Sequence, residues 1–132
     1  MSIRATCNQV FEETASLAAL RASGQRANWK LKDNIQRKDP VLVTISKAND
    51  VVKTAILNME PLVIGLERKI EDLKGDDRCF SESSDLKKEE ITQILENALS
   101  ELSESKKLIE TLGQGSLQAK CKIEVLQKGS KK

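Results

Sequence analysis

The chain has 132 residues and a formal net charge of +2, which is too small to indicate a nucleic-acid partner by itself. It contains no His, which excludes His-based acid–base catalysis and His metal ligands. With one Trp, two Phe and no Tyr, its core must be built from aliphatic side chains, and such a core favours a helical bundle over a β sandwich.

The first segment, residues 3–38, carries a periodic pattern with alternating steps of four and three residues, which predicts a helix. Several in-phase positions are not apolar: Thr14, Arg21, Gly24 and Asn28. We expect a kink or a short loop near Ser23-Gly24, because glycine inside a helix costs roughly 1 kcal/mol relative to alanine. Polar seam positions can select the register of packed helices, but a poorly buried stretch is the simpler interpretation.

Positive charge is concentrated at the end of this segment. A basic patch surrounds the single Trp and consists of Arg26, Lys30, Lys32, Arg37 and Lys38. Cationic side chains beside Trp29 can bind nucleic acid, an anionic lipid surface or an acidic protein segment. A lone Trp is not the platform of several aromatics on which nucleic-acid bases stack. The simpler expectation is that Trp29 packs on the bundle while the long cations extend past it.

The central segment, residues 40–74, has the clearest limits. Pro40 suits the first turn of a helix, and Gly75 suits a left-handed cap at its end. One apolar stripe follows steps of mostly three and four: Ile45, Ala48, Val52, Ala55, Met59, Leu62, Leu66, Ile70 and Leu73. Pro61 removes the hydrogen bond to the Leu57 carbonyl, so we expect a kink near Pro61.

Further apolar side chains lie off this stripe, so the central helix is expected to contact more than one neighbour. The predicted partner-binding residues are Trp29, Leu31, Ile35, Val51, Ile56 and Val63. Because the first helix is polar at Thr14, Arg21 and Asn28, we expect it to cover the central helix poorly there. A protein partner would fill that mismatch.

Residues 75–84 form a linker that is rich in turn formers. Ser81, Ser83 and Ser84 lie among acidic residues just before the next helix. Phosphate there would interact favourably with the helix N-terminus, so we consider phosphorylation of these serines, although a capping loop needs no such role.

The last segment, residues 84–126, keeps a four-three rhythm that predicts a third helix. Gly113-Gln-Gly115 resembles a stop, yet the register continues beyond it, so we expect a bend or fraying at the glycines. The alternation of Cys121, Ile123 and Val125 would also suit a short strand, but a lone strand has nothing to pair with, and we favour helix. Residues 127–132 are expected to be a disordered basic tail.

The cysteines, Cys7, Cys79 and Cys121, are odd in number and widely spaced, which argues against a disulfide framework and a zinc site. Cys7 and Cys121 are expected to be small core residues, whereas Cys79 beside Arg78 is the candidate for an exposed, activated thiol. No signal-peptide or membrane-span pattern is present, so we expect an intracellular protein, cytoplasmic rather than nuclear.

Together these segments predict an all-α fold: an elongated, antiparallel three-helix bundle (up-down-up) over residues 1–126 with coiled-coil-like packing. The competing architecture is an open set of helices that complete their core with other chains. We expect a non-enzymatic interaction subunit, an adaptor or scaffold that binds itself or other proteins through apolar seams. The alternative is a surface-binding module that uses the basic patch and the Lys-rich tail on nucleic acid or anionic membrane. No cofactor, metal or small-molecule substrate is expected.

Overall fold

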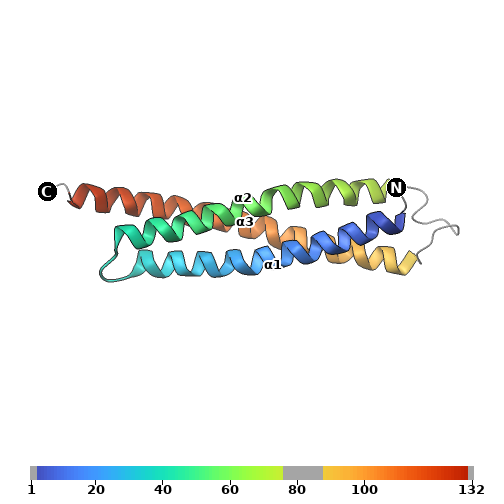
Figure 1. The fold of residues 1–132 in the computed structure, drawn as a ribbon, viewed down its shortest axis with the longest axis horizontal. Coiled ribbons are helices and arrows are strands. Elements are labelled where there is room, and N and C mark those ends of the chain that lie inside the picture. Colours follow the sequence, from blue (N-terminus) through green and yellow to red (C-terminus); the bar gives the residue numbers. More distant parts are fainter. Residues whose placement is uncertain (1–2, 76–87, 131–132) are drawn as a thin grey trace.

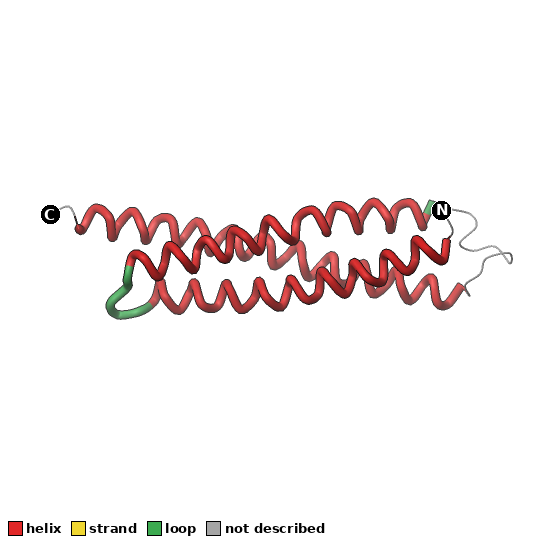
Figure 2. The backbone as a smooth tube through the Cα atoms, viewed as in Figure 1, coloured by secondary structure: helices red, strands yellow, loops and turns green. Residues whose placement is uncertain are grey.

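A computed structural model describes residues 3–75 and 88–130, and almost all of these residues are helical. The helices are α1 (Ile3–Gln36), α2 (Leu42–Lys74) and α3 (Lys88–Ser130). They run up, down and up along one long axis, so α2 is antiparallel to both neighbours while α1 and α3 are parallel (Figures 1 and 2). The all-α three-helix bundle predicted from the sequence is confirmed.

Each helix contacts both of the others, so the bundle is closed rather than open. The core draws its largest fully buried side chains from all three helices: Leu17, Leu31, Ile45, Met59, Leu66, Ile70, Ile91 and Leu112. These residues are aliphatic or Met, as the composition predicted. The apolar stripe of each segment therefore faces the other two, because burying it is the main favourable term in folding.

Helix α1 runs through Ser23-Gly24 without the break that we expected. Gly24 is buried, and a Cβ placed on it would lie 3.1 Å from Leu108 Cδ2 and 3.4 Å from Leu112 Cδ1. The glycine thus lets α3 approach α1 closely. Its missing side chain serves packing between helices, and the helical hydrogen bonds continue across it.

Helix α3 also differs from the expected bounds. It passes through Gly113 and Gly115 without interruption and continues to Ser130, beyond the predicted end at residue 126. A Cβ on Gly115 would lie only 2.8 Å from Asn28 Oδ1, whereas a Cβ on Gly113 would meet nothing within 4 Å. One glycine is therefore required by the neighbouring helix and the other is not.

Helix α2 begins at Leu42 and is continuous through the exposed Pro61. The kink at Pro61 and the coiled-coil detail of the packing stay predictions. Gly75 ends the helix as expected, and its N–H donates to the carbonyl of Glu71 at 3.0 Å. Its φ of −84° is right-handed, however, so the end is not the left-handed cap that we expected.

Two further expectations concern residues 76–87, which lie outside the described part of the chain. These are the phosphorylation of Ser81, Ser83 and Ser84 and the reactivity of Cys79. Both stay predictions.

Candidate interaction surfaces and buried polar contacts

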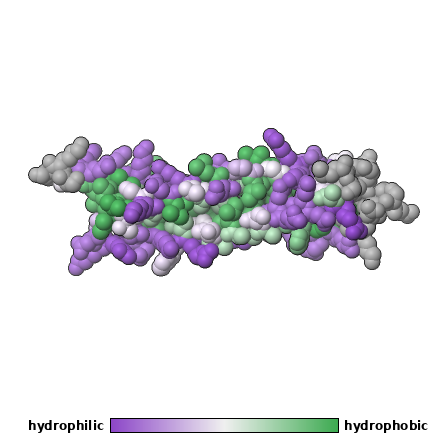
Figure 3. Space-filling view, in the orientation of Figure 1, coloured by the Kyte–Doolittle hydropathy of each residue, from purple (hydrophilic) through white to green (hydrophobic). Residues whose placement is uncertain are grey.

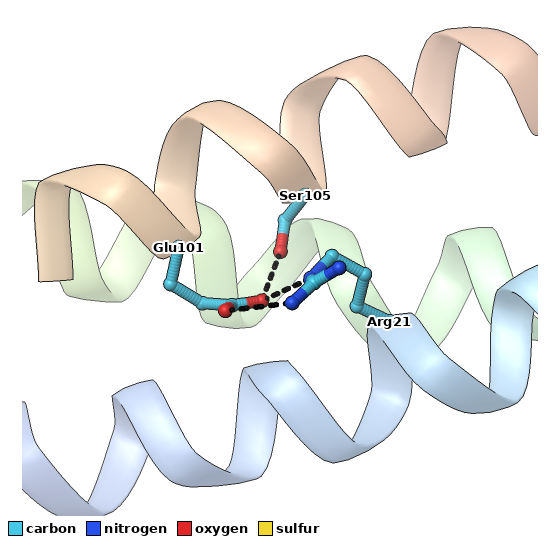
Figure 4. A network of polar contacts seen from close by, with 3 residues as sticks. All are labelled: Arg21, Glu101 and Ser105. Atoms are coloured by element: carbon cyan, nitrogen blue, oxygen red, sulfur yellow. Dashed lines mark hydrogen bonds and ion pairs between the residues drawn. The ribbon is translucent and has the colours of Figure 1, made fainter. Parts of the chain in front are cut away.

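The polar residues of α1 that we expected to be poorly buried face α3. Arg21 Nε donates a hydrogen bond to Glu101 Oε1 at 2.6 Å, and Arg21 Nη2 donates to Glu101 Oε2 at 3.3 Å (Figure 4). Ser105 Oγ donates to the same Glu101 Oε1 at 3.2 Å. The Glu101 side chain is 11% exposed and the Arg21 side chain is 27% exposed. At Arg21, α3 of the same chain therefore supplies the polar contact where we expected a partner protein, while the partner protein itself stays a prediction.

The Arg21–Glu101 pair has a simple electrostatic consequence. The hydrogen bond that Arg21 donates to Glu101 raises the pKa of Arg21, burial lowers this pKa, and the charges of Glu101 and Glu104 raise it further. With its pKa raised above the unfolded value, Arg21 stabilises the fold below that value, and this stabilisation is lost only as the pH rises through the folded pKa in strong alkali. Arg21 therefore stays charged under ordinary conditions.

Each of the other two helix interfaces also contains a polar contact. Between α1 and α2, Lys69 Nζ forms an ion pair with Glu13 Oε1. Between α2 and α3, Ser116 Oγ donates to Asn49 Oδ1 at 2.7 Å. Both contacts are only partly buried, and each joins particular positions of two neighbouring helices.

These polar contacts do not bring together the ligands of a metal site. In the described ranges, no group of three or more His, Cys, Asp or Glu residues could hold a metal ion. None of the described helices has the length and apolarity needed to cross a membrane. Cys7 is buried, as expected, but Cys121 is exposed and is not a core residue.

The basic patch lies on the surface, and Trp29 at its centre is exposed, contrary to our expectation. Trp29 is 68% exposed and does not pack into the bundle as we expected. It lines an open hollow of about 520 Å³ together with Ala22, Gln25, Arg26 and Lys30. Lys32 of α1 is also exposed, as are Arg37 and Lys38 just beyond its end, and Arg37 Nη2 lies 3.6 Å from Asp33 Oδ2.

The predicted partner-binding residues are divided between the core and the surface. Leu31 and Val63 are buried, at 0% and 5% exposure, so in this closed bundle they pack against the other helices. Ile35 and Ile56 are partly buried against the core. Val51 is 56% exposed, which leaves Val51 and Trp29 as the prominent surface residues of the set.

Val51 lies in a groove between α1 and α2. We call this hollow of about 330 Å³ the α1–α2 groove, and it is lined by Leu20, Ser23, Ala27, Asp50, Val51, Thr54, Ala55 and Asn58. We did not predict from the sequence that α1 contributes to this groove. A usable signal existed, because Leu20, Ser23 and Ala27 follow steps of three and four beside the main stripe.

Other apolar side chains are exposed on all three helices. Those most exposed are Phe11, Trp29, Val41, Val43, Val51, Leu57, Ile64, Leu99, Leu117 and Val125. Figure 3 shows such apolar surface (green) interleaved with hydrophilic surface (purple) on the side in view. Phe11 was not among the predicted residues, because it lies outside the periodic stripe of the first segment.

Comparison with known proteins adds no functional information. No protein-family model, no curated protein and no solved structure matches the chain.

Proposed function

We propose that the chain is a non-enzymatic interaction subunit of an intracellular assembly that binds an amphipathic helix of a partner protein in the α1–α2 groove. The observation that carries this proposal is the exposure of Val51 beside a hollow whose floor is already apolar. A branched aliphatic side chain that is 56% exposed gains free energy when a partner covers it.

The composition of the groove suits a helix. Leu20, Ala27 and Ala55 supply an apolar floor, and the small side chains of the two alanines let a helix of the partner protein approach closely. Ser23 and Asn58 are polar and exposed, so the lining has the apolar centre and polar rim typical of protein interfaces. Recognition of a helix in such a groove uses apolar anchors spaced by three and four residues.

The charge of the groove indicates the kind of helix that would bind. Asp50 is the charged side chain in the lining, and it is exposed. We therefore expect a partner helix with an apolar face and a Lys or Arg placed to meet Asp50. An exposed charge of this type contributes little affinity but favours one orientation of the bound helix.

A photoreactive amino acid at Val51 tests the proposal in cells. The matched control carries the same amino acid at Leu57, which is 69% exposed on another face of α2. A partner helix in the groove gives a defined crosslinked protein from position 51 and not from position 57. Equal crosslinking from both positions, or from neither, would contradict the proposal.

The identified protein then allows a binding measurement. Val51→Glu should weaken binding by about tenfold or more, because it places a charge against the apolar floor, while Leu57→Glu should leave the affinity unchanged. Binding should also persist at high salt, since apolar burial rather than exposed charge supplies the affinity.

A second candidate function is supported by the exposure of Trp29 between Arg26 and Lys30. An aromatic side chain flanked by cations is suited to the interface of an anionic membrane. Replacing Arg26, Lys30 and Arg37 by Ser should abolish binding to anionic lipid vesicles, and raised salt should weaken binding of the native chain. Retained binding after replacement would end this alternative.

A further inference from the structure

The outer face of α1 carries a second periodic stripe that the bundle does not cover. We call it the α1 outer stripe, and it consists of Phe11, Ala15, Ala18, Ala22, Gln25 and Trp29. The steps are four, three, four, three and four, which is the spacing of a helix that packs along its length against another helix. Phe11 and Trp29 are separated by five turns and so lie on the same side, about 27 Å apart at about 1.5 Å per residue.

The ends of this stripe are its most unusual feature. Phe11 is 63% exposed and Trp29 is 68% exposed, and they are the aromatic residues of the described part of the chain. A protein with so few aromatics would gain most by burying them, because each contributes a large apolar area. Instead, this chain places them at the two ends of one exposed face. Such a face indicates an interaction site.

We propose that the α1 outer stripe pairs with the same stripe of a second copy of this chain, with the two helices antiparallel around a twofold axis. The axis passes midway between Ala18 and Ala22. Phe11 then faces the second copy's Trp29, Ala15 faces Gln25, and Ala18 faces Ala22. Each of these contacts occurs twice, as a twofold interface requires.

The surroundings of Phe11 supply a place for the second copy's Trp29. Between α1 and α3 there is a hollow of about 160 Å³ lined by Phe11, Thr14, Ala15, Ala18, Ile94 and Asn97. A cavity of roughly 150 Å³ is sufficient to accept a benzene ring. The hollow at one end of the stripe is therefore large enough for the six-membered ring of an indole, and Trp29 at the other end of the stripe carries that ring.

Charge beside the stripe selects the second copy and the antiparallel direction. Glu12 and Arg26 lie along the same flank of the stripe. Both are exposed, and neither is in an ion pair with another described residue. In the antiparallel pair each Glu12 lies near the Arg26 of the other copy. In a parallel pair the flank that carries Glu12 and Arg26 would meet the opposite flank of the other copy, so the attraction between Glu12 and Arg26 would be lost.

The other flank of the stripe carries Arg21, whose charge does not repel the second copy. Arg21 lies on that side near the axis, where two copies would approach each other. Its guanidinium is held by Glu101 within its own chain, so the charge is already compensated. The three alanines at the centre of the stripe allow the two helices to approach closely, because they place no long side chain between them.

Sedimentation equilibrium of the purified chain over a concentration series tests the proposal. The native chain should form dimers, and Trp29→Ser should raise the dissociation constant by at least tenfold, because each dimer loses two aromatic contacts. The matched control is Leu57→Ser, which removes an equally exposed apolar side chain from another face and should leave the dissociation constant unchanged. Circular dichroism of each variant checks that the helices are retained.

Charge reversal tests the direction of pairing without removing apolar surface. Glu12→Arg and Arg26→Glu should each weaken the dimer several-fold. The double variant should recover the native dissociation constant, because the exchanged side chains would again face each other with opposite charges. Monomer at every concentration, equal effects of Trp29→Ser and Leu57→Ser, or a double variant weaker than both single variants would each overturn the proposal. The groove variant Val51→Glu should leave the dimer intact. The test of dimerisation and the test of partner-helix binding in the α1–α2 groove can therefore fail independently.

Discussion

Gly113 and Gly115 lie two residues apart on α3 and provide a matched test of the packing. A Cβ on Gly113 would meet nothing within 4 Å, whereas a Cβ on Gly115 would lie 2.8 Å from Asn28 Oδ1. Asn28 is 8% exposed, so its short side chain has little room to move away. Substituting alanine at each position therefore makes the same chemical change in two different environments.

The expected effects have opposite signs. Alanine in place of glycine stabilises a helix by about 1 kcal/mol, so Gly113→Ala should raise the free energy of unfolding by about 0.5 to 1 kcal/mol. Gly115→Ala gains the same helix propensity but forces an overpacked contact that costs about 1 to 3 kcal/mol. We therefore expect Gly115→Ala to lower the free energy of unfolding by about 1 kcal/mol.

Urea denaturation followed by circular dichroism measures both variants. The midpoint should move up for Gly113→Ala and down for Gly115→Ala, with an unchanged slope. Asn28→Ala removes the oxygen that the new Cβ would meet, so in that background Gly115→Ala should become stabilising. Equal stabilisation by Gly113→Ala and Gly115→Ala in the native background would refute the close approach of α1 and α3 at this level.

Three other predictions follow from the described contacts. Glu101→Ala should lower the free energy of unfolding by about 1 to 3 kcal/mol, because it removes the partner of the half-buried Arg21; an unchanged urea midpoint would contradict this. Cys121 should react with iodoacetamide in the folded protein, while Cys7 should react only after unfolding, and mass spectrometry of the labelled peptides would distinguish them. At concentrations where the chain is monomeric, the fluorescence of Trp29 should resemble that of Trp in water, and a blue-shifted emission would show that Trp29 is buried.

The sequence predicted the helices well because their stripes repeat over many turns. A step of three or four residues defines a helical face without reference to any other segment, so the order and type of the three elements were confirmed. The glycines were harder, since the same residue either interrupts a helix or lets a neighbour approach. Gly24 and Gly115 take the second role, and only the position of the facing helix distinguishes the two.

The candidate surfaces were less predictable for a related reason. Leu31, Val63 and Val51 are all aliphatic residues of strong helical segments, yet the first two are buried and the third is exposed. Which of them a neighbouring helix covers depends on how the three helices pack together, and the periodicity of one segment does not encode that packing. Arg21 shows the same limit, because its partner Glu101 lies 80 residues away in sequence.

The central claim is that this chain closes its own core and leaves its apolar outer faces for other molecules. Thermal unfolding of the purified chain, followed by circular dichroism at a concentration where light scattering shows a monomer, tests it most directly. The closed bundle should show a strong helical signal and one cooperative transition without any partner present. A gradual loss of helix on heating, with a sharp transition only after a partner is added, would contradict the closed bundle.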